Sequence, residues 1–188
     1  MTNKKPFVIA IAAVSGGGKT TITSRLLDVL PNSIAIYFDD YDFEECPEDI
    51  VAWVKSGGDP NEWTISPLIN DLLKVIHDGE RRIDYILMDY PFAYGHKEMK
   101  EYIDFAIFID TPLDIAFVRR ILRDFEAAAI EVVRDDLLGY LSHSREAYIH
   151  MLKTIKPDSD FIVDGSLSLA DIVEILREEI ERRVEVNS

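Results

Sequence analysis

The sequence is poor in cysteine and in basic residues, and it has no long apolar run. Its single cysteine, Cys46, excludes an internal disulfide framework and a cysteine-rich metal site. The 20 basic residues are outnumbered by 35 acidic ones, and the resulting formal charge of −15 disfavours nucleic acid and anionic membranes as partners. No apolar run approaches the roughly 20 residues of a membrane-spanning helix. We expect a cytoplasmic protein with no signal peptide, because residues 1–6 lead directly into the first predicted strand.

The length and the apolar content predict a single domain, residues 1–188, with a substantial core. Strand-like apolar runs alternate with helical patterns, which indicates an α/β fold with a parallel sheet of about five strands and helices on both faces. Strands are expected at Phe7–Val14, Ser33–Phe38, Tyr85–Asp89, Phe105–Ile109 and Phe161–Asp164. Helices are expected at Lys19–Leu30, Pro47–Lys55, Pro67–His77, Pro112–Ala129, Asp135–Leu152 and Leu169–Val184.

The most informative segment lies between the first strand and the first helix. Residues 13–20 read Ala-Val-Ser-Gly-Gly-Gly-Lys-Thr, the pattern of a P-loop (Walker A) with alanine at its first glycine position. Glycines let the backbone present N–H groups to phosphate oxygens, and the helix N-terminus adds further donors. Lys19 can reach the β- and γ-phosphates of ATP, and Thr20 can ligate Mg²⁺. The predicted nucleotide-binding residues are Ser15, Gly16, Gly17, Gly18, Lys19, Thr20 and Thr21.

Carboxylates follow two of the predicted strands, where ligands of parallel sheets bind. Asp39 and Asp40 end the second strand, and a carboxylate there can accept a proton from a substrate hydroxyl or hold a magnesium-bound water. Successive side chains point opposite ways, so we expect only one of the two to face the γ-phosphate. A plain turn is the alternative. Asp89 ends an apolar strand in the Walker B pattern and is the second predicted Mg²⁺ ligand.

Aromatic residues near the same edge are candidates for an acceptor site. Residues 42–64 contain both tryptophans and are interpreted as an insertion over the active edge. The loop after Asp89 is rich in aromatic residues, which suit a wall for a ring-shaped substrate. Ordinary core packing is the alternative for these side chains. The predicted substrate-binding residues are Asp40, Tyr41, Trp63, Tyr90 and Phe92.

Three arginines lie close together in a chain that is otherwise strongly acidic. Arg119 and Arg123 share one face of a predicted helix, and Arg120 points about 100° away from Arg119. Arginine forks suit phosphate groups, so residues 119–134 are predicted to form a lid in which Arg119 and Arg123 clamp transferred charge. The alternative is a solvated helix face whose arginines pair with neighbouring carboxylates.

Taken together, these segments resemble the uridine kinase, nicotinamide riboside kinase and phosphoribulokinase group of P-loop kinases. The likeness is strongest in Val14–Thr21, Leu30–Tyr41 and Ile109–Asp124. It implies that Asp39 is the substrate-activating aspartate and that the lid arginines clamp phosphate. The chain departs from the group at Asp89, where many members carry glutamate, and at Phe125–Ala129, which replaces an acidic-Arg-Gly-Arg run.

We therefore predict a small-molecule kinase that transfers the γ-phosphoryl group of ATP to a hydroxyl of a nucleoside-like or other small acceptor. Asp39, Lys19, Arg119 and Arg123 are its predicted catalytic residues. Two alternatives are a P-loop NTPase that acts as a nucleotide-binding switch and a degenerate kinase that binds nucleotide without catalysis. The sequence does not determine the acceptor, the choice between ATP and GTP, or the oligomeric state.

Overall fold

A parallel β-sheet forms the centre of the molecule. The computed structural model describes residues 5–78 and 81–186, so the expectation about a signal peptide falls partly on residues outside it. The strands are β1 (Phe7–Ala12), β2 (Ser33–Tyr37), β3 (Tyr85–Asp89), β4 (Phe105–Asp110) and β5 (Phe161–Asp164). Their order is β2-β3-β1-β4-β5, and every neighbouring pair is parallel. The predicted α/β fold with about five parallel strands is confirmed.

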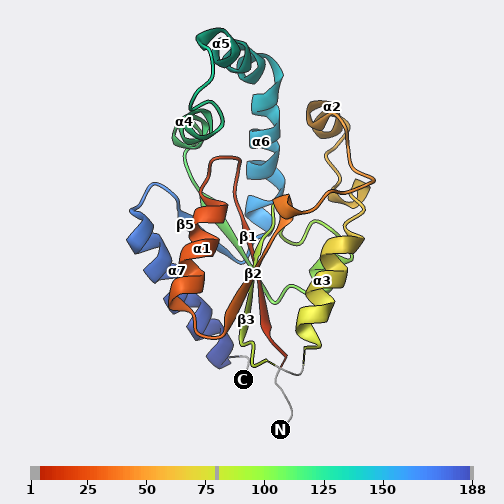
Figure 1. The fold of residues 1–188 in the computed structure, drawn as a ribbon, viewed down its shortest axis with the longest axis vertical. Coiled ribbons are helices and arrows are strands. Elements are labelled where there is room, and N and C mark those ends of the chain that lie inside the picture. Colours follow the sequence, from red (N-terminus) through yellow and green to blue (C-terminus); the bar gives the residue numbers. More distant parts are fainter. Residues whose placement is uncertain (1–4, 79–80, 187–188) are drawn as a thin grey trace.

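Helices cover both faces of the sheet and extend beyond one end of it (Figure 1). Helices α1 (Lys19–Val29) and α7 (Leu169–Val186) lie on one face, and α3 (Ser66–Ile76) lies on the other. Beyond the carboxyl ends of the strands are α2 (Ile50–Lys55), α4 (Leu113–Asp124), α5 (Ile130–Gly139) and α6 (Arg145–Thr154). Short 3₁₀ turns occur at Phe38–Asp40, Pro60–Glu62, Met99–Glu101 and Lys156–Asp158, and a π-helical segment at Tyr140–Ser144. None of the helices within 5–78 and 81–186 has the length and apolarity to cross a bilayer.

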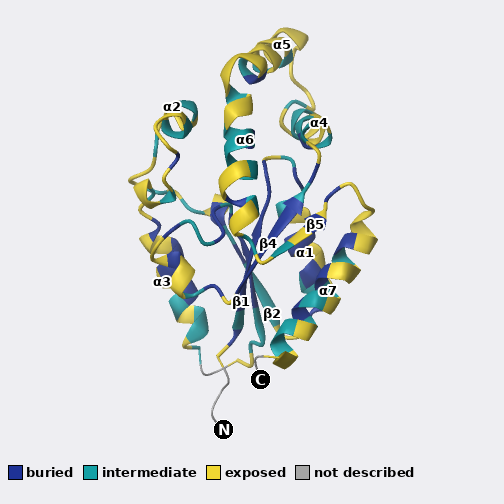
Figure 2. Ribbon diagram, turned by 180° about the vertical axis from the view of Figure 1, so that it is seen from behind, coloured by how far each residue is buried: buried dark blue, intermediate teal, exposed yellow. Residues whose placement is uncertain are grey.

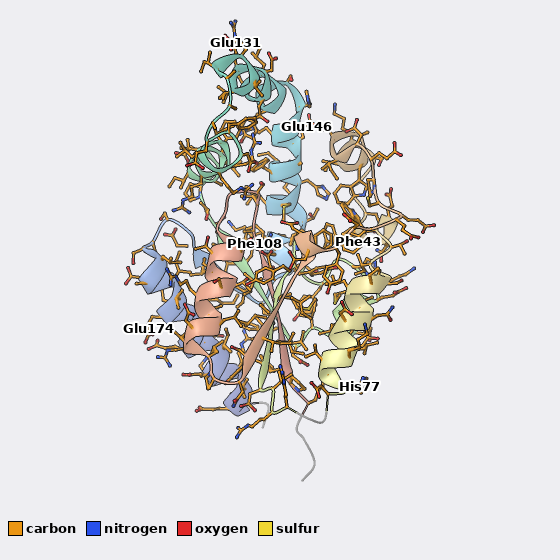
Figure 3. The ribbon with its side chains drawn as sticks, in the orientation of Figure 1. Phe43, His77, Phe108, Glu131, Glu146 and Glu174 are labelled. Atoms are coloured by element: carbon orange, nitrogen blue, oxygen red, sulfur yellow. The ribbon has the colours of Figure 1, made fainter. Side chains whose placement is uncertain are left out.

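Strand β1 is apolar along its whole length because both of its faces are buried. Val8, Ala10 and Ala12 join the core under α3, whereas Ile9 and Ile11 join the core under α1 and α7. This pattern is expected for a central strand of a parallel sheet covered on both sides. Figure 2 shows the buried residues gathered on the sheet and the inner helix faces. Phe108, labelled in Figure 3, lies at the centre of this core and is fully buried.

The predicted helices around residue 125 differ from those in the structure. The prediction of one helix over Pro112–Ala129 is wrong at its C-terminal end, because α4 ends at Asp124. The chain turns there, and the Phe117 ring of α4 stacks on Tyr140, which directly follows α5, with centroids 3.8 Å apart. The helix predicted to begin at Asp135 begins instead at Ile130, and it continues through the π-helical segment into α6.

Three further boundaries move by a few residues. The helix predicted from Pro47 begins at Ile50, because the Asp49 side chain caps it by accepting hydrogen bonds from the N–H groups of Val51 (2.9 Å) and Ala52 (3.0 Å). Strand β1 ends at Ala12, where the glycine-rich loop starts, and Phe38 opens a 3₁₀ turn in place of ending β2.

A tight contact after β5 leads to a first prediction. Gly165 is buried, and a Cβ atom there would lie 2.8 Å from the backbone N and Cα of Thr111. Gly165→Ala should therefore lower the free energy of unfolding by roughly 1–3 kcal/mol, the usual effect of overpacking. Gly139→Ala is the control, because Gly139 is helical and its Cβ would lie 3.7 Å from the nearest His143 atom. That change should stabilise by about 0.5–1 kcal/mol. Urea unfolding measures both, and equal midpoints would contradict the prediction.

Candidate active site

The loop between β1 and α1 has the backbone shape of an anion cradle. Gly16 and Gly18 have φ angles of 75° and 101°, in the left-handed region that glycine adopts without strain. No side chain caps the N-terminus of α1, so its first N–H groups remain available to an anion. Ala13, in place of the usual glycine, is buried and is not among the residues with positive φ, so it meets the condition for alanine at this position.

Neighbouring elements hold the loop in place. The buried Thr111 side chain, which follows β4, donates a hydrogen bond from Oγ1 to the carbonyl oxygen of Gly17 at 2.8 Å. Helix α4 approaches the loop so closely that a Cβ atom on Gly16 would lie 3.0 Å from the backbone N of Arg120. Glycine at position 16 thus serves both the turn and the close packing of α4.

The carboxylate of Asp89 joins the loop to β3. Asp89 is 2% exposed, and Lys19 Nζ lies 2.5 Å from its Oδ1. Thr20 Oγ1 donates a hydrogen bond to Asp89 Oδ2 at 2.6 Å. A hydroxyl and a carboxylate side by side suit Mg²⁺, which is bound by one or two protein oxygens together with substrate phosphates. Among the described residues there is no cluster of three or more His, Cys, Asp or Glu side chains that could hold a metal by itself.

The phosphate loop borders a cavity of about 1150 Å³. The phosphate loop and α4 line one end of it, and Trp53, Trp63, Phe92, His150 and Met151 are among the residues that line the rest. The structure brings most of the predicted site residues to this cavity. These are Ser15, Gly16, Gly17, Gly18, Lys19, Thr20, Thr21, Asp39, Trp63, Phe92, Arg119 and Arg123.

Three predicted substrate-binding residues do not line this cavity. Asp40 is exposed beside it, so of the two neighbouring acids only Asp39 lines it. Tyr41 donates a hydrogen bond to Asp71 Oδ2 at 3.2 Å, and burial together with the Asp71 charge raises the pKa of Tyr41 to about 12. Tyr90 is fully buried, and burial raises its pKa. Its ring packs edge-on against Phe38 and Phe92.

Helix α6 contributes residues that the sequence reasoning missed. Tyr148, Met151 and Ile155 line the cavity at a spacing of three and four residues, which places them on one helical face. The same periodicity was present in the sequence and could have identified this face. Trp53 also lines the cavity, and its ring packs against His150 with centroids 6.2 Å apart.

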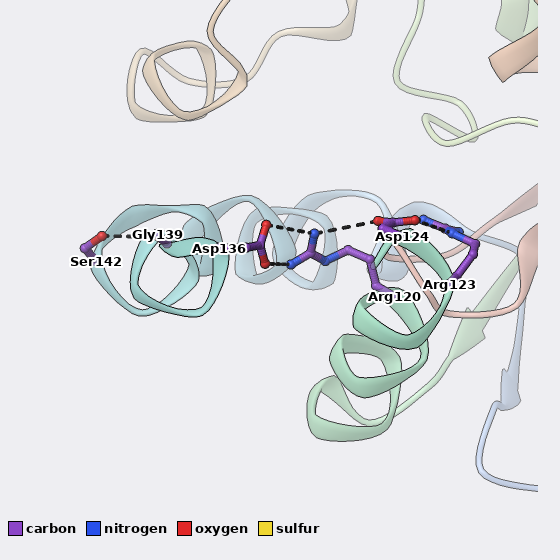
Figure 4. Close-up of polar contacts among 6 residues, drawn as sticks. All are labelled: Arg120, Arg123, Asp124, Asp136, Gly139 and Ser142. Carbon is purple, nitrogen blue, oxygen red and sulfur yellow. Dashed lines mark hydrogen bonds and ion pairs between the residues drawn. The ribbon is translucent and has the colours of Figure 1, made fainter. Parts of the chain in front are cut away.

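The three arginines of α4 have different surroundings. The side chain of Arg120 is 16% exposed and forms an ion pair with Asp136 on α5; Asp124 lies 3.7 Å away. Figure 4 shows its guanidinium between these two carboxylates. Arg123 donates to Asp124 from Nε at 2.7 Å, and that hydrogen bond and the nearby charges of Asp124 and Asp39 raise the pKa of Arg123. Arg119 is exposed and lines the cavity. Arg120 thus ties α4 to α5, whereas Arg119 and Arg123 are the more accessible cations.

The fold and the loop together define a class of protein. A parallel sheet with β1 at its centre, a glycine-rich loop leading into α1 and a carboxylate at the end of the adjacent β3 are the features of P-loop nucleotide-binding proteins. No protein-family model matches the chain.

Comparison with curated proteins identifies relatives within that class. The chain is 26% identical to a uridine kinase of Macrococcus caseolyticus, in an alignment that covers 97% of this chain and 99% of the relative. It is 25% identical over 177 residues to a uridine kinase of Borrelia hermsii, covering 83% and 85%. The predicted resemblance to the uridine kinase group is confirmed, and so is the prediction of a phosphotransferase that uses a hydroxyl acceptor.

Solved structures share the fold at low sequence identity. A sugar kinase from Janibacter aligns with a TM-score of 0.55 and 16% identity, over 94% of this chain and 95% of that one. A possible uridine kinase from Bacillus stearothermophilus aligns with a TM-score of 0.51 and 17% identity, over 87% and 91%. A gluconokinase from Sinorhizobium meliloti aligns with a TM-score of 0.52 and 13% identity, over 91% and 89%. These neighbours confirm the predicted P-loop NTPase-type α/β fold.

The ion pair between α4 and α5 provides the second prediction. Asp136→Asn should leave the Arg120 guanidinium without its closest carboxylate partner. We expect the free energy of unfolding to fall by roughly 1–3 kcal/mol, between the values for breaking exposed and buried ion pairs. The control is Asp135→Asn, an adjacent exposed position on the same helix, which should change stability by less than about 0.5 kcal/mol. Thermal unfolding measures both, and hydrogen exchange in α5 should rise only for Asp136→Asn. Equal effects of the two changes would show that the pair does not hold α5.

Proposed function

We propose that the protein transfers the γ-phosphoryl group of ATP to a hydroxyl group of a small, uncharged, nucleoside-like acceptor. One observation carries this proposal: a single cavity joins the phosphate loop, Asp39, the arginines of α4 and an aromatic wall. The kinase relatives imply ATP as donor, normally with Mg²⁺. In this proposal residues 42–64 cover the acceptor and residues 119–134 act as the lid.

At the donor end, the loop N–H groups and the N-terminus of α1 bind the phosphates. Lys19 exchanges its contact with Asp89 for one with the β- and γ-phosphates. Thr20 and Asp89 would hold Mg²⁺, which would neutralise phosphate charge. The Lys19 ammonium and the Thr20 hydroxyl meet on the same carboxylate, so the groups proposed to bind phosphate and metal already lie together.

At the point of transfer, Asp39 accepts the proton of the acceptor hydroxyl while the new O–P bond forms and the bond from the γ-phosphorus to the leaving ADP oxygen breaks. Arg119 and Arg123 balance the charge on the transferred group. Arg123 and Asp39 line the same cavity, and the Asp39 charge adds to the larger effect of Asp124 in raising the pKa of Arg123, which supports their action at one end of the cavity.

At the acceptor end, the cavity wall is aromatic and uncharged. The Trp53 and Trp63 rings lie edge-on with centroids 6.2 Å apart, and Phe92 packs against both. The charged side chains that line the described cavity belong to Lys19, Asp39, Arg119, Arg120, Arg123 and Asp136, all on the phosphate loop, the turn after β2 or the α4–α5 region. Such a wall suits an uncharged ring better than an anion such as gluconate. A nucleotide-binding switch is not favoured, because the named relatives are kinases.

A panel of acceptors tests the proposal. ADP formation from ATP and Mg²⁺ is measured with uncharged nucleosides, uncharged sugars or gluconate, and without any acceptor. We expect nucleosides to raise the rate above the acceptor-free rate by at least about 10-fold, and gluconate to have no effect. Turnover that is independent of every acceptor would favour the nucleotide switch. Turnover with gluconate alone would contradict the assignment of an uncharged acceptor.

The two neighbouring acids provide a matched pair of variants. Asp39→Asn keeps the shape of the side chain and removes the base, so kcat should fall by roughly 10²-fold or more while ATP affinity stays within a few-fold. Asp40→Asn should change kcat by less than about threefold, because Asp40 does not line the cavity. Steady-state kinetics with the best acceptor and calorimetry with ATP measure both variants. A larger loss for Asp40→Asn would exchange the roles of the two acids.

A further inference from the structure

A tyrosine from α6 reaches the phosphate loop. Tyr148 is only 8% exposed, and it lines the same cavity as Ser15 and Lys19. Burial raises the pKa of this phenol, and the Ser15 side chain on the phosphate loop lowers it to a smaller extent, which places the two side chains near each other in the cavity. Helix α6 follows the predicted lid by more than ten residues in the chain, so the packing of the helices brings this hydroxyl to the loop.

A column of aromatic rings fixes the position of Tyr148. The ring packs edge-on against Tyr140 with centroids 5.4 Å apart, and Tyr140 stacks on Phe117 of α4. The Arg120 guanidinium, paired with Asp136, lies over Phe117 at 5.2 Å. The column therefore runs from the phosphate loop through α6 to the contact between α4 and α5.

The π-helical segment before α6 sets the direction of this face. It spans Tyr140–Ser144, and Ser142 Oγ donates to the carbonyl oxygens of Leu138 (2.8 Å) and Gly139 (3.2 Å). A π-helical turn contains extra residues, which rotates the following helix relative to the preceding one, and such segments are frequent at functional sites. The Ser142 and Gly139 contact appears in Figure 4.

The Tyr148 phenol is in its neutral form at physiological pH. Burial raises the pKa of Tyr148, and the smaller opposing effects of the Arg120 charge and the Ser15 side chain do not reverse that direction. A neutral phenol is a hydrogen-bond donor. This donor lines the same cavity as Ser15 and Lys19, on the loop whose backbone N–H groups face the phosphates in the proposed function.

We propose that Tyr148 is a phosphate-binding residue of this site, whose hydroxyl donates a hydrogen bond to the γ-phosphate of the bound nucleotide. The inference rests on the proposed function for the presence of the nucleotide. Residues 125–129 contain no basic side chain, so α6 provides a donor that this part of the lid does not. A hydrogen bond from a neutral phenol to a charged phosphate is stronger than one to a neutral acceptor, which favours this contact.

Tyr148→Phe tests this assignment because it removes the hydroxyl and keeps the ring. Calorimetry with Mg²⁺ compares a non-hydrolysable ATP analogue, which has a γ-phosphate, with ADP, which has none. We expect affinity for the analogue to fall by about 10-fold and affinity for ADP to stay within about twofold. Tyr140→Phe is the matched control in the same column, and it should leave both affinities within about twofold.

Other results would overturn the assignment. Unchanged affinity for the analogue in Tyr148→Phe, or an equal fall for the analogue and ADP, would mean that the hydroxyl does not contact the γ-phosphate. Equal losses in Tyr148→Phe and Tyr140→Phe would assign the effect to packing of the column. The binding measurement needs no acceptor. If Tyr148→Phe has the expected effect on binding but the unmodified protein phosphorylates no acceptor, the result would contradict the proposed function and support the Tyr148 contact.

Discussion

The buried carboxylate of Asp89 is the group on which the candidate site depends. A buried charge is costly unless it is paired and hydrogen-bonded, and Lys19 and Thr20 supply both kinds of contact at 2.5 and 2.6 Å. The register of the sheet pairs Asp89 with Ile11 on β1, shortly before the loop begins. Because Lys19 and Thr20 are the first residues of α1, their contacts with the buried carboxylate hold the first turn of this helix beside the end of β3. The loop is organised by contacts within the protein before any nucleotide arrives.

Electrostatics make the cavity unusual for this molecule. The chain carries a formal charge of −15, yet Lys19 and the three arginines of α4 all line one cavity. Most of this acidic surface repels polyanions, whereas the cavity presents four basic side chains that would attract a triphosphate. Asp136 and Asp124 hold Arg120 within this cluster. The Arg120 guanidinium lies over Phe117, the first ring of the aromatic column that ends at Tyr148 in the cavity. Charge and packing therefore act together between the α4–α5 region and the phosphate loop.

The sequence predicted the features that depend on local pattern. The strands and the phosphate loop follow from apolar periodicity and glycine spacing, and the structure has both. The break between α4 and α5 was not predictable in this way, because Ala127–Ala129 favour helix locally. The tertiary contacts of Phe117 and Arg120 override that preference. Tyr90 and Phe92 likewise look equivalent in the sequence. Only the packing after β3 makes the first a core residue and the second a cavity residue.

The origin of the aromatic wall has a consequence for how such a protein can diversify. Apart from Phe92, which follows β3, the wall comes from elsewhere: Trp53 and Trp63 from the segment between β2 and α3, and His150 and Met151 from α6, whereas the phosphate loop and Asp89 belong to the sheet and its immediate connections. Substitutions in the wall can therefore reshape one end of the cavity without disturbing the Lys19–Asp89 contact at the other. Selection for a new substrate can act on a peripheral module while the reaction centre is inherited unchanged.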